Sequence, residues 1–233
     1  MADLKKAENI LQTYLRPQTF PVALKLCRSE EDLSGKVKRP LNDLGHQVAV
    51  CQAIGMVRRY GWTLAVGQED QCCLGGGLAM GFIDEAPQGL PFPEEKRHEP
   101  GIYSHLLISP LARADFEPDL LVIYVNSAQA MRLGHAAVMG AGLKVDAQAT
   151  GLGDCVDVVG YAVKSGECQF ILPSGGDRVY GSTQDHEVIF AIPKEKIDAV
   201  MNGLESTHKM GFRYPMMTDM NHRPALPSFL EIP

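Results

Sequence analysis

Cysteines are the residues in this chain with the clearest chemical potential, because thiolates ligate soft metals and act as nucleophiles. There are six of them: Cys27, Cys51, Cys72, Cys73, Cys155 and Cys168. Their spacing matches neither a ferredoxin run nor the paired Cys-x-x-Cys of a zinc ribbon. Any metal site must therefore be assembled by folding, from elements that lie far apart in the chain.

The elements that would position these cysteines follow from the pattern of apolar residues. We predict helices over residues 3–16, 46–60, 128–139 and 194–206 and strands over 21–26, 62–66, 106–108, 119–125, 169–172 and 188–192. The unbroken apolar run at 119–125 indicates a strand buried on both faces. The sequence thus predicts a mixed α/β fold with a central sheet flanked by helices. We expect one domain over residues 1–233, with residues 211–233 as a tail packed on the body.

Three local patterns refine this prediction. Cys73 precedes a glycine-rich segment that reads as the start of a small-residue helix. Residues 84–100 are rich in proline and charge and read as a surface loop, and residues 173–178 read as a tight turn between strands. A weak repeat relates Cys51-Gln52-Ala53 to Ala128-Gln129-Ala130, which would suit two related halves.

Several longer motifs resemble the uncharacterised family called domain of unknown function 169, or ArCR, found largely in anaerobic archaea and bacteria. The motifs are Phe20-Pro21-Val22-Ala23-Leu24-Lys25, Cys51-Gln52-Ala53, Glu69-Asp70-Gln71-Cys72-Cys73-Leu74-Gly75-Gly76, Asn126-Ser127-Ala128-Gln129-Ala130-Met131-Arg132, Gly153-Asp154-Cys155 and Leu172-Pro173-Ser174-Gly175-Gly176-Asp177-Arg178. The resemblance implies that Cys51, Cys73 and Cys155 belong to the family pattern. It transfers no activity, and its anaerobic background favours oxygen-sensitive iron chemistry.

Three thiolates suit an iron–sulfur cluster of the 4Fe–4S type with one iron left open. We therefore expect Cys51, Cys73 and Cys155 to be metal ligands, with Cys72 as a candidate for the fourth position. Cys27, His46 and His135 are further candidates for that position. Small residues at Gly75 and Gly76 would let backbone amides approach the cluster. The structural alternative is that free cysteines pack in the core as small apolar side chains. We favour this alternative for Cys27 and Cys168.

Other residues are candidate ligand contacts with structural alternatives. Gln129 follows a buried strand, where ligands bind in many α/β sheets, although helix capping by its neighbours explains the same motif. Arg178 could meet an anion, although a salt-bridged arginine on a turn is favoured. His135 could face a cofactor pocket and ligate a haem-type tetrapyrrole.

Composition limits the class of protein. The net charge of −6 and the lack of a basic stripe argue against nucleic acid as a partner. No segment approaches the roughly 20 apolar residues of a membrane span, and the N-terminus lacks a signal peptide's apolar core, so we expect a cytoplasmic protein. The favoured function is an iron–sulfur redox protein that transfers electrons to a partner protein or binds a small-molecule ligand. The alternative is a metal-free module that binds a small ligand or cofactor and senses redox state through its thiols. Whether the chain is an enzyme or a homo-oligomer stays open.

Overall fold

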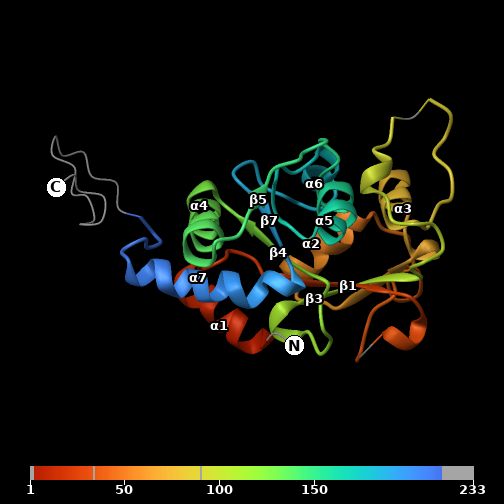
Figure 1. The fold of residues 1–233 in the computed structure, drawn as a ribbon. Coiled ribbons are helices and arrows are strands. Elements are labelled where there is room, and N and C mark those ends of the chain that lie inside the picture. The colour runs from red at the N-terminus through yellow and green to blue at the C-terminus, as the bar shows by residue number, and fades with distance from the viewer. Residues whose placement is uncertain (1–2, 34, 90, 217–233) are drawn as a thin grey trace.

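The computed structural model describes residues 3–33, 35–89 and 91–216, and its centre is a seven-stranded mixed sheet (Figure 1). The strands are β1 (Val22–Cys27), β2 (Leu64–Gly67), β3 (His105–Pro110), β4 (Leu120–Val125), β5 (Val145–Asp146), β6 (Cys168–Ile171) and β7 (Val188–Pro193). Their order across the sheet is β2-β3-β1-β4-β7-β6-β5. Only β5 and β6 run parallel; every other neighbouring pair is antiparallel, with Val22 of β1 opposite Pro110 on one side and Val122 on the other.

Helices cover both faces of this sheet. The α-helices are α1 (Leu4–Tyr14), α2 (Val50–Tyr60), α3 (Leu74–Met80), α4 (Ser127–His135), α5 (Val163–Ser165), α6 (Gly175–Val179) and α7 (Ile197–Lys209). Three segments have the wider turn of a π-helix, namely η2 (Pro40–Leu44), η6 (Ala136–Gly140) and η7 (Asp154–Ala162). Short 3₁₀ segments are η1 (Glu30–Asp32), η3 (Gln68–Asp70), η4 (Glu94–Lys96), η5 (Leu111–Arg113) and η8 (Lys194–Lys196).

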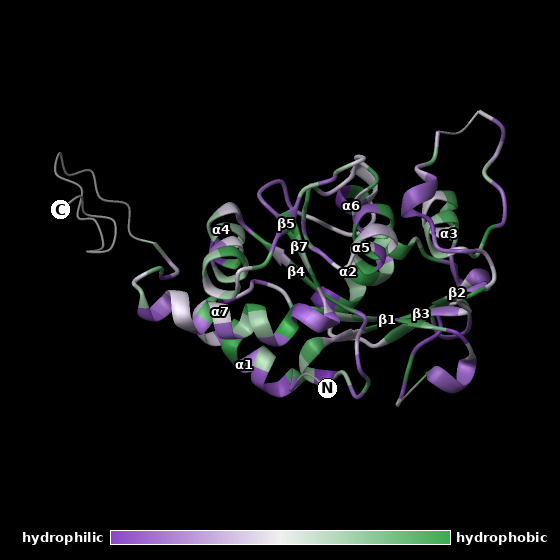
Figure 2. Cartoon of the chain, in the orientation of Figure 1, coloured by the Kyte–Doolittle hydropathy of each residue, from purple (hydrophilic) through white to green (hydrophobic). Residues whose placement is uncertain are grey.

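Each face of the sheet has its own apolar core, because successive side chains on a strand point to opposite sides. We call the first the α2 face: Val122 and Tyr124 of β4 pack there with α2, α3 and η7. We call the second the α7 face: Leu121 and Ile123 of the same strand pack there with α1, α4 and α7. The apolar sheet between the two helical layers is visible in Figure 2.

Most of the predicted elements are present. All six residues of β4 are buried, as the apolar run at 119–125 predicted. The side chain of Asn126 accepts a hydrogen bond from the amide of Gln129 and caps α4, and Gly61 ends α2 with a φ of 71°. In the described part of the chain, no helix is long and apolar enough to cross a bilayer.

Two predictions differ from the structure. Residues 173–178 were predicted as a tight turn, but α6 begins within them because the Ser174 hydroxyl caps the helix. The surface loop predicted for residues 84–100 buries Lys96 and His98. The helices related by the weak repeat, α2 and α4, pack on opposite faces of the sheet, and the relation between two halves stays a prediction. Residues 217–233 of the predicted tail lie outside the described residues.

Candidate metal centre

Three cysteines from distant parts of the chain lie on the α2 face. Cys51 is the second residue of α2, Cys155 is the second residue of η7, and Cys73 is the residue just before α3. Cys51 and Cys155 are buried and Cys73 is half-buried. The charge of each thiolate would raise the pKa of its neighbours, because Cys73 acts on Cys51 and both act on Cys155. The three thiols that the sequence predicted as ligands therefore lie on one face of the sheet.

Two buried carboxylates lie beside these thiols. Asp154 is the first residue of η7, and Asp177 lies in the first turn of α6. The sulfur of Cys51 and one carboxylate oxygen from each aspartate all lie within 4.8 Å of one another. The aspartates are 0% and 1% exposed, so water does not screen their charges. This donor set of one thiol and two carboxylates has the composition of a metal site.

Local backbone structure fixes both carboxylates. The Tyr124 hydroxyl donates to Oδ2 of Asp154 at 2.7 Å. The amide of Ser174 donates to Oδ2 of Asp177 at 2.6 Å, and the Ser174 hydroxyl accepts from the amide of Asp177 at 3.1 Å. Gly153 has a φ of 65°, and a Cβ there would lie 1.9 Å from Oδ2 of Asp177. Only glycine lets the two acidic segments approach so closely.

A buried arginine, Arg58, packs against the tyrosine that holds Asp154. The guanidinium of Arg58 stacks 3.9 Å from the centre of the Tyr124 ring. The same guanidinium donates to both carboxylate oxygens of Glu187, at 2.8 and 3.0 Å. The charge of Arg58 is therefore paired with Glu187, and its contact with the site runs through the tyrosine ring.

Electrostatics favour protonated groups in this pocket when no cation is bound. Burial raises the pKa of Cys51 and Cys155, and the neighbouring Asp154 and Asp177 raise it further. Burial and the adjacent carboxylate of Asp177 likewise raise the pKa of Asp154, against the smaller opposing effects of Tyr124 and Arg58. A bound metal ion would displace these protons and neutralise the charge that remains.

The other residues predicted near the cluster contribute less. Cys72 is exposed on the surface. Gly75 lies close to Cys73, since a Cβ there would be 3.9 Å from its sulfur. A Cβ at Gly76 would lie 2.9 Å from Cγ2 of Val50, so this glycine lets α3 pack against the start of α2 next to Cys51.

The structure does not bring the remaining candidates to the thiols. The side-chain amide nitrogen of Gln129 donates to the carbonyls of Leu15 and Arg16, which ties α4 to the end of α1. Arg178 forms a salt bridge with Asp185 and donates to the carbonyl of Gln184. His135 lies in α4, on the α7 side of the sheet, with its ring centroid 4.4 Å from that of Phe212.

Cys27 and Cys168 are buried among apolar side chains on the α7 face. Burial raises the pKa of each thiol to about 11, as expected for cysteines that pack as small apolar residues.

The chain matches the family described as domain of unknown function 169, uncharacterised ArCR, over residues 10–203. The chain belongs to this family. It is 25% identical over 222 residues to an uncharacterised protein of Methanocaldococcus jannaschii, and the match covers 86% of this chain and 93% of that protein. No solved structure matches the chain. The ArCR match spans all the cysteines and both aspartates of the candidate centre but supplies no activity.

Asp154, Asp177 and Tyr124 are residues of this ArCR protein that sequence reasoning missed as site residues. A signal was present, since each aspartate follows a glycine in a motif that carries the family resemblance, Gly153-Asp154-Cys155 and Gly175-Gly176-Asp177. The pattern Ser174-x-x-Asp177 is also a helix-capping signature, which could have predicted α6.

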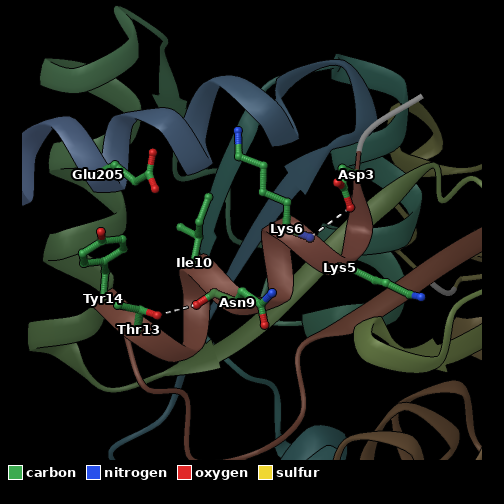
Figure 3. A pocket seen from close by; sticks show the side chains of 8 residues that line it. All are labelled: Asp3, Lys5, Lys6, Asn9, Ile10, Thr13, Tyr14 and Glu205. Atoms are coloured by element: carbon green, nitrogen blue, oxygen red, sulfur yellow. Dashed lines mark hydrogen bonds between the residues drawn. The ribbon is translucent and has the colours of Figure 1, made fainter.

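A separate surface pocket of about 390 Å³ lies between α1 and α7, on the other side of the sheet (Figure 3). Its lining residues are Asp3, Lys5, Lys6, Asn9, Ile10, Thr13, Tyr14 and Glu205. Two of its hydrogen bonds stabilise α1 itself, from the amide of Lys6 to Asp3 and from the Thr13 hydroxyl to the carbonyl of Asn9. With mixed charges and no thiol or imidazole in its lining, this pocket is a weaker candidate than the buried centre.

Proposed function

We propose that this protein is an iron-dependent redox protein whose cluster is held by Cys51, Cys73 and Cys155. One observation carries the proposal. Cys51 and Cys155 are buried and Cys73 is half-buried at the starts of three helical segments on the same face of the sheet, although more than a third of the chain separates Cys73 from Cys155. Thiolates are the usual ligands of iron–sulfur clusters, and three of them leave one iron for another ligand.

The surroundings of the thiols suit such a group. Cys51 and Cys155 lie in the first turns of α2 and η7, where the helix dipole favours negative charge. Burial of both residues keeps water away from the sulfurs. An iron–sulfur cluster, when bound, supplies one-electron transfer, and its potential depends on charge, hydrogen bonds and burial around it.

The metal-free alternative is less well supported by the geometry. Thiol chemistry requires thiolates, yet burial raises the pKa of Cys51 and Cys155 and keeps them protonated. A haem-type site is also less well supported, because His135 and the thiols lie on different sides of the sheet. The buried thiols are therefore better suited to a bound metal than to free thiol chemistry.

Anaerobic purification after expression with added iron tests the proposal. We expect coloured protein with broad visible absorbance, iron and acid-labile sulfide. The variants Cys51→Ser, Cys73→Ser and Cys155→Ser should each lose most of the iron. Cys27→Ser and Cys168→Ser are matched controls, because they change buried thiols on the α7 face, and they should retain it.

Two results would contradict the proposal. One is wild-type protein that stays colourless and iron-free after anaerobic reconstitution, which would leave the metal-free alternative. The other is equal loss of iron in the control variants, because that would trace the loss to folding and not to ligation. A sharp Soret band in place of broad absorbance would indicate a tetrapyrrole.

A further inference from the structure

The carboxylates of Asp154 and Asp177 share an unusual arrangement. On each side chain Oδ2 is held by a hydrogen bond, from the Tyr124 hydroxyl and from the Ser174 amide respectively. On each side chain the other oxygen, Oδ1, is buried and has no hydrogen-bond partner. Buried polar atoms are nearly always paired, so two orphaned oxygens in one pocket indicate a ligand.

A cation suits this pocket best. One oxygen of each carboxylate lies within 4.8 Å of an oxygen of the other. Within the described ranges, neither forms a salt bridge, and the nearby Arg58 is paired with Glu187. Two ionised carboxylates buried side by side without a counter-ion are unfavourable. A divalent cation would balance their charge.

We propose that Asp154 and Asp177, together with Cys51, ligate one divalent transition-metal ion, so that the centre is a mixed thiolate–carboxylate site. The inference rests on the proposed function, because it concerns the same pocket and shares Cys51 with it. Because Cys51 is one of its ligands, this ion is distinct from the iron that the three thiols leave open. The ligand atoms already lie within 4.8 Å of one another, close to the separation that one shared metal requires.

The donor set also selects the class of metal. Carboxylate oxygens disfavour Cu(I), and a thiolate disfavours Mg²⁺ and Ca²⁺. Borderline ions such as Fe²⁺, Co²⁺ and Zn²⁺ bind both kinds of donor.

Titration with Co²⁺ tests this inference directly. The full-length protein is freed of metal with a chelator and titrated without oxygen, and the thiolate-to-cobalt and visible ligand-field bands are followed. We expect Asp154→Asn and Asp177→Asn to weaken Co²⁺ binding roughly tenfold or more and to shift the ligand-field bands. Both should keep the thiolate band at saturation. Asp185→Asn, an exposed aspartate that pairs with Arg178 close to α6, should bind like wild type.

Folding is checked on the same samples. Asparagine matches aspartate in size and cannot ionise, so the metal-free variants should unfold at midpoints equal to or above that of wild type. If one aspartate variant fails to fold, Co²⁺ binding by the other aspartate variant and by Tyr124→Phe tests the inference. The Tyr124 hydroxyl holds only Asp154, and its removal should weaken Co²⁺ binding less than loss of the carboxylate. Wild-type affinity in folded Asp154→Asn and Asp177→Asn would overturn the inference.

Cysteine variants separate this inference from the proposed function. If Cys73→Ser and Cys155→Ser keep their iron after anaerobic reconstitution while the aspartate variants lose Co²⁺ binding, the three-thiol centre is wrong and the carboxylate site stands. If the two cysteine variants lose their iron while the aspartate variants bind Co²⁺ like wild type, the proposed function stands and the inference is wrong.

Discussion

The α2 face and the α7 face each bury two cysteines and one arginine, yet these residues have different neighbours. On the α7 face, Cys27 and Cys168 pack among apolar side chains, and burial is the main cause of their raised pKa. On the α2 face, Cys51 and Cys155 lie beside Asp154 and Asp177, which raise the pKa of both thiols beyond the effect of burial. Residue type and burial alone therefore do not distinguish a packing cysteine from a candidate ligand. The neighbouring carboxylates do.

The arginines differ in a parallel way. Arg58 on the α2 face pairs with both oxygens of Glu187 and stacks on Tyr124. Arg132 on the α7 face donates to the Thr207 hydroxyl and to the carbonyl of Leu204, and burial lowers its pKa. In the part of the chain that the structure describes, Arg132 forms no salt bridge. One arginine belongs to an ion pair, and the other is a buried charge with neutral partners.

Replacement of each arginine by methionine should give the largest difference between the two faces in the free energy of unfolding. Arg58→Met removes both hydrogen bonds of the guanidinium to Glu187 and leaves this buried carboxylate only the longer ion pair with Arg59, at 3.5 Å, so it should lower the free energy of unfolding by about 3 kcal/mol. Arg132→Met removes a buried charge that has no acidic partner and should change that free energy by less than about 1 kcal/mol. Urea unfolding of both variants measures the difference. Equal losses would show that the two arginines do the same structural work.

Gly153 offers a second comparison, with Gly151 as its control. Both glycines have positive φ, so alanine at either position should cost about 1–2 kcal/mol of backbone strain. Only at Gly153 would the new Cβ overlap Oδ2 of Asp177, at 1.9 Å, whereas the space at Gly151 is open. Gly153→Ala should therefore also weaken Co²⁺ binding, by roughly tenfold or more. Equal Co²⁺ affinity in the two alanine variants would contradict the placement of Asp177.

Thiol reactivity should distinguish the exposed cysteine from the buried cysteines of the α7 face. Cys72 is exposed and should be alkylated by iodoacetamide in the folded protein at neutral pH, while Cys27 and Cys168 should react only after unfolding. Mass spectrometry of the alkylated protein identifies the sites. Rapid labelling of Cys168 in folded protein would contradict its burial.

The same thiols predict a pH dependence. The pKa of Cys168 is about 11 in the fold against an ordinary 9.0. Its contribution to stability is therefore complete below pH 9 and is lost as the pH rises toward about 11, where the unfolded chain releases a proton that the fold retains. Cys168→Ala should reduce the loss of stability that urea unfolding shows across this window. A variant with an unchanged slope would show that other groups cause the loss.

The sequence predicted the layers of the molecule well and its charges poorly. Apolar periodicity placed α1, α2 and β4 to within a few residues, because burial of an apolar face decides where such elements begin and end. The family pattern singled out Cys51, Cys73 and Cys155, and the fold places them on one face of the sheet. Whether they bind a cluster stays a prediction.

The carboxylates were missed for a physical reason. An aspartate that follows glycine is usually a solvated turn residue, and only the packing of α6 against η7 buries Asp154 and Asp177 together. The prediction of a turn at residues 173–178 concealed this contact, because it placed Arg178 at the site and left Asp177 without a role. Arg178 pairs with Asp185 and not with the carboxylates of the candidate centre.

X-ray absorption at the iron edge of anaerobically reconstituted protein tests the central claim most directly. The account predicts a first shell dominated by sulfur with a smaller oxygen contribution, and the oxygen contribution should fall in Asp177→Asn while the sulfur contribution remains. A first shell made only of oxygen and nitrogen would show that Cys51, Cys73 and Cys155 do not ligate iron, and it would contradict the account.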